Sequence, residues 1–359
     1  MGNKKNRENK LNKAYHNQYR KYSFIVECQA KGDQDLSDYV ADNALKIESF
    51  NFRPIKGKKL IAVIGGGMST EREVSYMTSN GVVNSLLQLN YQVIFIDMGS
   101  DIAIVLQSIN PDLVFNALHG TYGEDGCIPG LLNILHIPYT GPGVLASALA
   151  MNKKKTNEIC RIHKLQVIES KLVSKSDNLS TDPIKRPYVV KPIAQGSSVG
   201  VQVIFEDDDF SFAQYNFPYG DEVLVEKYIK GKEIQVAILN GKALGALEIR
   251  LLNNKRFYDY EAKYTKGFTE HIYPAVIPHD KYQEVLSIAE KLCKIFECED
   301  GMIRAEFIYE ESSGEIYILE LNSHPGMTPL SICPEIAAYQ NISYTELVQQ
   351  IVEKAIYES

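Results

Sequence analysis

Polar side chains recur at alternate positions in two apolar runs near the C-terminal end, and this pattern constrains the fold most. In the run 316–322, strand alternation places Glu320 and Asn322 on one face. In the run that begins at residue 302, the same alternation points Arg304 and Glu306 to one side. If the two strands are neighbours in a sheet, two carboxylates, an amide and a guanidinium meet at one place.

These side chains have two interpretations. Carboxylate and amide oxygens are the ligands that Mg²⁺ prefers, and substrate phosphates often complete its coordination. A guanidinium beside them suits phosphoryl transfer, so the pattern predicts a metal-assisted phosphoryl-transfer site. Ion pairing on the surface of a half-buried sheet is the other interpretation, with about 0–1 kcal/mol per pair. The rest of the chain has to decide between them.

The composition is that of a globular protein with an acidic balance. The chain has 359 residues, 45% of them hydrophobic and 23% charged, so we expect two or three domains. The net charge of -7 argues against nucleic acid as a partner. The 6 cysteines include no CxxC pair, which favours reduced thiols in the cytoplasm over zinc or disulfides. No apolar stretch approaches the roughly 20 residues that span a bilayer, so no membrane association is expected.

Residues 1–57 differ in character from the rest. Basic residues crowd the start at Lys4, Lys5, Arg7, Lys10, Lys13, Arg20 and Lys21. Only Glu8 offsets them, so we expect a basic, solvated and partly disordered N-terminal extension rather than an interaction arm. Removing residues 1–50 is then expected to leave turnover intact.

Strand and helix patterns alternate after this extension. Buried-strand runs lie at 60–64, 92–97 and 113–116. A glycine turn at 65–67 follows the first run, and Thr70 with Glu73 forms a capping-box pattern that opens a helix. The alternation predicts a parallel sheet with crossover helices. Farther along, strands are expected at 188–191 and near 233–250 and 302–321, and helices at about 281–296 and 343–356, the second opened by Ser343 with Glu346.

Three segments suit a nucleotide. Lys191 ends a strand and the glycine-rich loop 195–200 follows, so a cation and accessible backbone N–H groups can meet phosphates. The segment 223–229 offers extended backbone to an adenine edge, and Glu233 follows as an acid for ribose hydroxyls. Taken singly, these segments also fit a flexible hairpin or a charged edge strand.

A dinucleotide-binding site is the weaker hypothesis. Gly65 and Gly67 follow the first strand and Asp97 ends a later one, as in nicotinamide-dependent oxidoreductases. That pattern next requires Gly or Ala where this chain has Thr70, so the spacing fails.

In the order of its lysine, glycine-rich loop, acidic hinge and paired carboxylate strands, the chain resembles the ATP-grasp ligases. From residue 58 onward it is similar to the D-alanine–D-alanine ligases. The matching segments are 65–75, 117–120, 123–126, 138–143, 191–200, 257–264 and 320–328. The resemblance implies an α/β chain with an ATP-grasp fold preceded by a parallel-sheet N-terminal domain. The implied parts are the extension 1–57, a substrate domain 58–144, a central ATP-grasp lobe 145–226, and a C-terminal lobe with the metal site, 227–359.

The resemblance also implies roles for individual residues. Those expected to bind ATP are Lys153, Lys191, Ser197, Glu226, Lys227, Ile229, Glu233, Phe257, Lys263 and Leu319. Those expected to contact substrate are Glu71, His119, Lys263, Arg304, Gly326 and Ser331. Those expected in catalysis are Glu71, Ser197, Tyr264, Arg304 and Gly326. Those expected to hold two Mg²⁺ ions, which Mn²⁺ can replace, are Glu306, Glu320 and Asn322.

Within this set, Glu71 would take the ammonium of a first D-alanine, while Arg304 and the Gly326 N–H face its reacting carboxylate. Ser331 would hold the carboxylate of a second D-alanine. Whether His119 contacts the substrates directly stays open.

The implied activity is ATP-dependent joining of two D-alanines through D-alanyl phosphate, for peptidoglycan precursor synthesis, by a cytoplasmic homodimer. D-alanine–D-lactate ligase is the alternative, and the dipeptide-type loop that contains Tyr264 disfavours it. The chain departs from the family pattern at Glu306 and Asn152, where Asp is common, and at Thr121 and Tyr122. None of these departures removes a catalytic group.

Overall fold

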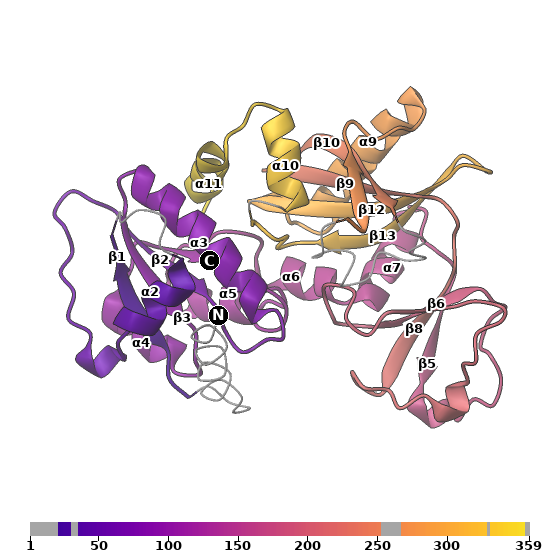
Figure 1. The fold of residues 1–359 in the computed structure, drawn as a ribbon, viewed down its shortest axis with the longest axis horizontal. Helices are drawn as coiled ribbons and strands as arrows, with labels where there is room; N and C mark the ends of the chain where they lie inside the picture. The colour runs from indigo at the N-terminus through magenta and orange to yellow at the C-terminus, as the bar shows by residue number, and fades with distance from the viewer. Residues whose placement is uncertain (1–20, 30–34, 253–266, 329–330, 356–359) are drawn as a thin grey trace.

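The computed structural model describes residues 21–29, 35–252, 267–328 and 331–355, which form three β-sheets (Figure 1). The first sheet has the order β1-β3-β2-β4. Its strands are β1 (Phe24–Cys28), β2 (Leu60–Gly65), β3 (Gln92–Asp97) and β4 (Leu113–Asn116). β2 runs parallel to β3 and β4, and every residue of β2 is buried, as expected for a strand covered on both faces. The predicted parallel sheet is confirmed for these three strands.

Helices cover both faces of this sheet. They are α2 (Leu36–Asn43), α3 (Arg72–Gln88), α4 (Ile102–Ile109) and α5 (Cys127–Leu135), with the 3-10 turn η1 (Ile47–Ser49). Successive residues of β2 join different cores, because strand side chains alternate between faces. Val63 shares a core with Leu86 of α3, whereas Ile64 shares one with Leu106 of α4. The helices α3 and α4 therefore lie on opposite faces.

The second sheet is antiparallel and has the order β5-β8-β6-β7. Its strands are β5 (Ser170–Ser174), β6 (Tyr188–Pro192), β7 (Gln202–Ile204) and β8 (Glu222–Lys227), with the 3-10 turns η2 (Lys175–Asp177) and η3 (Phe212–Gln214). Aromatic side chains fill its small core. The fully buried Tyr188 ring stacks on Phe212, with the ring centroids 6.3 Å apart.

The third sheet is antiparallel and has the order β11-β10-β9-β12-β13. Its strands are β9 (Lys232–Leu239), β10 (Lys242–Leu251), β11 (Thr269–Ile272), β12 (Met302–Glu310) and β13 (Glu315–Asn322). The helix α9 (His279–Ile295) packs on one face and α10 (Ile332–Tyr339) on the other. The helices α6 (Val144–Met151) and α7 (Lys153–Ile162) contact β13, and α6 lies between the first and third sheets in Figure 1.

The last helix returns to the first sheet. α11 (Tyr344–Glu353) packs against α3, and its Leu347 and Ile351 share a core with Leu86. The predicted capping box at its start is confirmed, since Ser343 Oγ accepts from Glu346 N at 3.3 Å and Glu346 Oε2 accepts from Ser343 N at 2.8 Å. One hydrophobic core, to which α11 contributes, therefore joins the first and third sheets.

The capping box predicted for α3 is wrong. The helix begins at Arg72 with Glu71 in the N-cap position, and no side chain caps it there. Thr70 lies outside the helix, and Glu71 N donates instead to Ser69 Oγ at 3.2 Å. The Glu71 carboxylate is thereby left to face the loop that contains Ser197, which accounts for the departure from the usual pattern.

The expectation of a solvated, partly disordered extension is wrong for the described residues between 24 and 49. β1 pairs antiparallel with β3 along its whole length. Ile25 is fully buried, and α2 contributes Leu36 and Val40 to the core beside α3. The run of lysines that precedes this segment concealed a short apolar strand of five residues. Removing residues 1–50 would take away a strand and a helix, so a loss of stability is expected instead of an intact enzyme.

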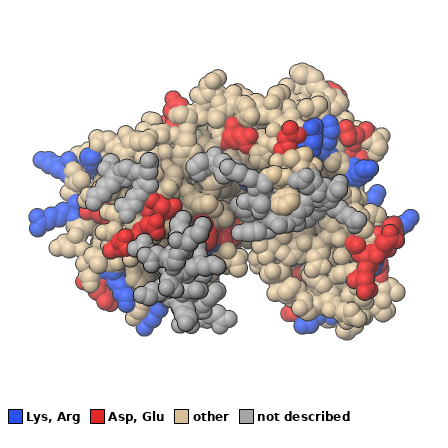
Figure 2. Space-filling model, in the orientation of Figure 1, with Lys and Arg blue, Asp and Glu red and all other residues tan. Residues whose placement is uncertain are grey.

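Surface charge agrees with the acidic composition. On the face shown in Figure 2, Lys and Arg side chains lie in separate groups, with Asp and Glu among them. The described residues on this face therefore form no continuous basic surface for a polyanion. Among the described residues, the helices are all too short or too polar to cross a membrane.

The docked N-terminal strand can be tested by substitution. Ile25→Ala should lower the free energy of unfolding by about 2–5 kcal/mol, because it leaves a cavity at a fully buried site. Urea denaturation measures the change, and Glu48→Ala on the exposed surface of the same segment is the control that should change little. Equal stability of the two variants would show that β1 does not pack as described.

Candidate active site

The two polar strands are neighbours, as the sequence predicted. In the β12–β13 pair, Arg304 lies opposite Asn322 and Glu306 lies opposite Glu320. Arg304 Nε donates to Glu306 Oε1 at 3.0 Å and Arg304 Nη2 donates to the same oxygen. Burial alone would lower the pKa of the guanidinium, but the Glu306 carboxylate raises it above its ordinary value. The site therefore keeps a fixed cation beside two carboxylates.

A cavity of about 420 Å³ lies between the second and third sheets. It is lined by residues predicted to bind ATP: Lys153, Lys191, Glu226, Lys227, Ile229, Glu233 and Leu319. Ile168, Val189 and Ile249 add apolar surface suited to a purine base. The predicted Phe257 and Lys263 lie outside the described residues.

A buried ion pair forms the inner wall of this cavity. Lys191 Nζ lies 2.6 Å from Glu226 Oε2, and Asn157 Nδ2 donates to Glu226 Oε1 at 3.3 Å. Burial would lower the pKa of the Lys191 ammonium, but the charge of Glu226 raises it above its ordinary value. Lys191 is therefore held as a cation where phosphates would bind. Sequence reasoning missed Asn157, because its contact with Glu226 spans 69 positions.

Lys153 connects the cavity to the glycine-rich loop and to the carboxylates. Its Nζ donates to Gln195 O at 2.8 Å and lies 3.5 Å from Glu320 Oε2. In the loop, Ser197 and Ser198 have φ values of 51° and 58°, in the left-handed region. Two such residues in succession fold the loop back, and Ser197 lines a second cavity while Ser198 lines the first.

The second cavity, of about 1040 Å³, holds the residues predicted to contact substrate. Among the described residues they are Glu71, His119, Arg304, Gly326 and Ser331, and Ser197, predicted for ATP binding and catalysis, lines the same cavity. Ser331 Oγ accepts from Thr328 N at 3.0 Å, which fixes the hydroxyl near Gly326. The remaining predicted catalytic residue, Tyr264, lies outside the described residues. Glu306 and Glu320 line both cavities, so the two spaces meet at this pair of carboxylates.

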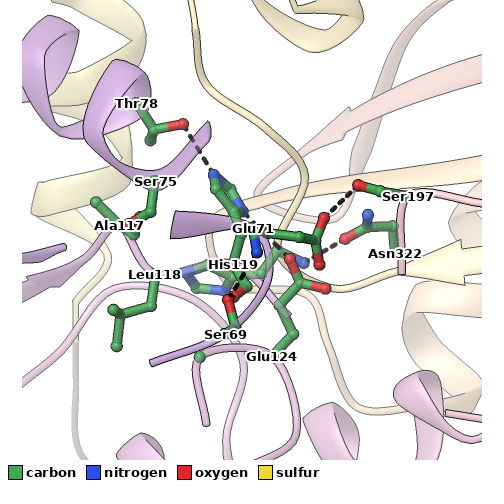
Figure 3. A network of polar contacts seen from close by, with 12 residues as sticks. Ser69, Glu71, Ser75, Thr78, Ala117, Leu118, His119, Glu124, Ser197 and Asn322 are labelled. Atoms are coloured by element: carbon green, nitrogen blue, oxygen red, sulfur yellow. Dashed lines mark hydrogen bonds and ion pairs between the residues drawn. The ribbon is translucent and has the colours of Figure 1, made fainter. Parts of the chain in front are cut away.

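Glu71 and Ser197 meet although 126 positions separate them. The Ser197 hydroxyl donates to Glu71 Oε1 at the entrance to α3 (Figure 3). Gly120 has a φ of 69°, and a Cβ there would come within 2.6 Å of Glu71 Oε2. Glycine at this position lets the chain pass close to the carboxylate, which leaves room for the contact between Glu71 and Ser197.

His119 is held by the protein on both ring nitrogens. Its Nε2 lies 2.8 Å from Thr78 Oγ1, and its Nδ1 lies 3.2 Å from Glu124 Oε1 (Figure 3). Burial alone would raise the pKa of the Glu124 carboxyl, but the hydrogen bond from His119 holds it below its ordinary value. The ring is 4% exposed, which leaves no nitrogen free to act on a substrate.

Sequence reasoning also missed Gln235. It lies opposite Glu306 on β9, and its Nε2 donates to Glu233 Oε1 at 2.9 Å and to Glu306 Oε2 at 3.1 Å. The amide orientation is fixed, because its oxygen would repel both carboxylates. Gln235 Oε1 is then a buried oxygen that has no hydrogen-bond partner among the described residues. The signal was present in the sequence, since Glu233 and Gln235 alternate on one strand face.

These oxygens fit a hard cation only together with a nucleotide. In the described part of the chain, no three or more His, Cys, Asp and Glu side chains cluster in a way that could hold a metal. Glu306 and Glu320 supply two carboxylates, and Asn322 and Gln235 supply amide oxygens. Mg²⁺ commonly binds through one or two carboxylates plus substrate phosphates, so the donor set fits Mg²⁺ that arrives with ATP.

The dinucleotide hypothesis finds no support at Asp97, the last residue of β3. Asp97 is fully buried, and its two carboxylate oxygens accept from Arg72 at 2.7 Å each. The Tyr76 hydroxyl also donates to it at 2.7 Å. Its oxygens are engaged in the core, so Asp97 is not placed to receive a ribose.

Comparison with known proteins identifies the family. Residues 162–353 match the family model of the D-ala D-ala ligase C-terminus, and residues 105–142 match that of the N-terminus. The chain is 60% identical over 303 residues to a D-alanine–D-alanine ligase of Rickettsia felis, covering 84% of this chain and 94% of that protein. It is 59% identical, with the same coverage, to the one of Rickettsia typhi. A crystal structure of the Bacillus anthracis D-alanine–D-alanine ligase complexed with ATP has a TM-score of 0.71 and 30% identity, and covers 82% of this chain and 97% of that one.

The buried pair Lys191–Glu226 should contribute strongly to stability when one partner is removed. Lys191→Met leaves a buried carboxylate without its cation and should cost about 3–5 kcal/mol of unfolding free energy in urea without nucleotide. The double variant Lys191→Met/Glu226→Leu should recover most of the loss, because it removes both charges. Lys281→Met, which breaks the exposed pair with Glu284, is the matched control and should change little. A double variant no more stable than Lys191→Met would contradict the buried pair.

Proposed function

The chain belongs to the D-alanine–D-alanine ligase family, and we propose that it joins two D-alanine molecules at the expense of ATP. The product is D-alanyl-D-alanine for peptidoglycan precursors, formed through D-alanyl phosphate. The meeting of the two cavities at Glu306 and Glu320 carries the proposal. One cavity suits the nucleotide and the other the amino acids, so the γ-phosphate and a substrate carboxylate can come together at these carboxylates.

The first step activates a carboxylate, which does not react with an amine while its oxygen is a poor leaving group. Lys153 and Lys191 bind the ATP phosphates, and Arg304 faces the carboxylate of the first D-alanine. An oxygen of that carboxylate attacks the γ-phosphorus, the bond to the bridging oxygen breaks, and ADP leaves. Mg²⁺, when bound by Glu306, Glu320 and Asn322, neutralises phosphate charge during this transfer.

The second step forms the peptide bond. Ser331 holds the carboxylate of the second D-alanine, whose amine loses a proton and attacks the acyl carbon. The Arg304 guanidinium and the Gly326 N–H donate hydrogen bonds to the oxyanion, which then expels inorganic phosphate. Glu71, oriented by Ser197, binds the ammonium of the first D-alanine. Enclosure of the site limits hydrolysis of the acyl phosphate by water.

The remaining expectations are proposals that rest on the family. They are a homodimer, a cytoplasmic location, and a division into a substrate domain (58–144), a central lobe (145–226) and a C-terminal lobe (227–359). The division is supported by the three sheets, which fall within these three ranges apart from β1 and Lys227, the last residue of β8.

Turnover is the direct test of the activity. Phosphate release should require ATP, Mg²⁺ and D-alanine together, and L-alanine should not replace D-alanine. In an equimolar mixture of D-alanine and D-lactate near neutral pH, the dipeptide should dominate, because a site built to bond an amine leaves polar groups unpaired with the hydroxyl of D-lactate. Coupled ADP release with product analysis measures both. Equal release with L-alanine would contradict the ligase, and mainly ester product would favour the lactate alternative.

The assignment of Glu320 as a metal ligand can be tested by comparing two glutamates, Glu320 and Glu346. Glu320→Gln should reduce turnover by more than the roughly 100-fold that outer-sphere changes typically cost, and should weaken Mn²⁺ binding in the presence of ADP. Glu346→Gln removes only part of the cap of α11, so both properties should stay as in the unmodified chain. Electron paramagnetic resonance of Mn²⁺ and steady-state kinetics give the two readouts. The assignment is wrong if the two variants bind Mn²⁺ equally well.

A further inference from the structure

The Thr78 hydroxyl lies in a buried chain of hydrogen bonds that joins α3 to the loop after β13. Its Oγ1 lies 2.8 Å from His119 Nε2 and accepts from Met327 N at 3.3 Å. Thr78 is 1% exposed and Met327 4% exposed, and 249 positions separate them. Thr78 lines neither of the two large cavities, so it does not reach the substrates itself.

The partners fix the direction of each hydrogen bond. A backbone N–H can only donate, so Thr78 Oγ1 accepts from Met327. The Glu124 carboxylate accepts from His119 Nδ1, and a neutral imidazole then has its lone pair on Nε2. In a neutral ring the Thr78 O–H therefore donates to Nε2, along the contact drawn in Figure 3. The series of hydrogen bonds runs from Met327 through Thr78 and His119 to Glu124. It specifies one tautomer of the neutral His119 ring.

This chain of bonds fixes the peptide next to the proposed oxyanion donor. Met327 directly follows Gly326, and the Tyr344 hydroxyl donates to Met327 O, so both polar groups of Met327 are held. The same helix, α3, has Glu71 at its start and Thr78 farther along. Thr78 thus ties the position of the Gly326 backbone to that of the Glu71 carboxylate.

We propose that Thr78 is a positioning residue, which acts through Met327 and His119 to set the Gly326 N–H against the substrate held by Glu71. The inference rests on the proposed function, because it assumes that the Gly326 N–H stabilises the oxyanion. It gives His119 a structural part in place of direct contact with the substrates. A displacement of about 1 Å at a reacting centre can reduce the rate on the order of 100-fold, so a single hydroxyl far from the chemistry can matter.

The test compares three variants on α3. Thr78→Val keeps the shape and removes the hydroxyl, and Thr78→Ser keeps the hydroxyl. Ser79→Ala is the matched control, because it removes a buried hydroxyl that bonds only within the helix, to Ser75 O at 2.7 Å. Thr78→Val should lower kcat for dipeptide by about 10–100-fold with KM for ATP unchanged, and should release more phosphate per dipeptide as acyl phosphate is lost to water. Thr78→Ser and Ser79→Ala should stay close to the unmodified enzyme in both readouts.

Each result decides the matter. Thr78→Val with the kcat and phosphate ratio of Ser79→Ala, or Thr78→Ser as impaired as Thr78→Val, would overturn the proposal. Nitrogen-15 NMR of the unmodified chain gives a readout that needs no folded variant. A proton on His119 Nδ1 is expected, and a ring protonated on Nε2 alone would overturn the proposal. An unmodified enzyme without D-alanine-dependent turnover would contradict the proposed function instead, and the NMR result would still decide the hydrogen-bond chain.

Discussion

The register of β12 between β9 and β13 is the constraint on which the site depends. In this register Glu306 lies opposite Gln235 on one side and opposite Glu320 on the other. A shift by one residue would turn Phe307 toward the cavities and push Glu306 into an apolar core. The core prevents that shift, because Ile303 and Phe307 are fully buried in the cluster beneath α9. Packing on the apolar face therefore holds the charged face in place.

The site also keeps charged side chains away from water. A fold selected for stability alone would avoid such buried charges. Lys191 with Glu226 and Arg304 with Glu306 are both buried pairs. Attraction between such partners often fails to offset their loss of hydration, and apolar residues of similar shape are frequently as stable. Their presence is explained by function, since cations already oriented and desolvated need little rearrangement when phosphate charge develops beside them. The two sheets that border the nucleotide cavity supply these charges from rigid strands.

Local patterns predicted much of the fold and of the site, and the failures have physical causes. Alternation along β12 and β13 placed Arg304 and Glu320 correctly, because strand side chains repeat every two residues whatever the surroundings. The capping box predicted at Thr70 does not form, because the tertiary contact of Glu71 with Ser197 overrides the local preference. β1 was not predicted, because it is stabilised by pairing with β3, a strand far along the chain. No local sequence pattern shows such a pairing. The contacts of Thr78 were invisible for the same reason.

The position of β1 also bears on how copies of the chain can meet. Without it, β3 would end the sheet with a row of unpaired N–H and C=O groups, the arrangement that promotes strand addition between molecules. β1 satisfies that row along its length, and Ile25 on its outer side pairs with Leu45, which shortens the new edge. β1 therefore reduces the tendency of the protein to aggregate through the edge of the first sheet. The edge that remains on this side is shorter than the one that β3 would expose, which leaves fewer backbone groups for a shared sheet between copies.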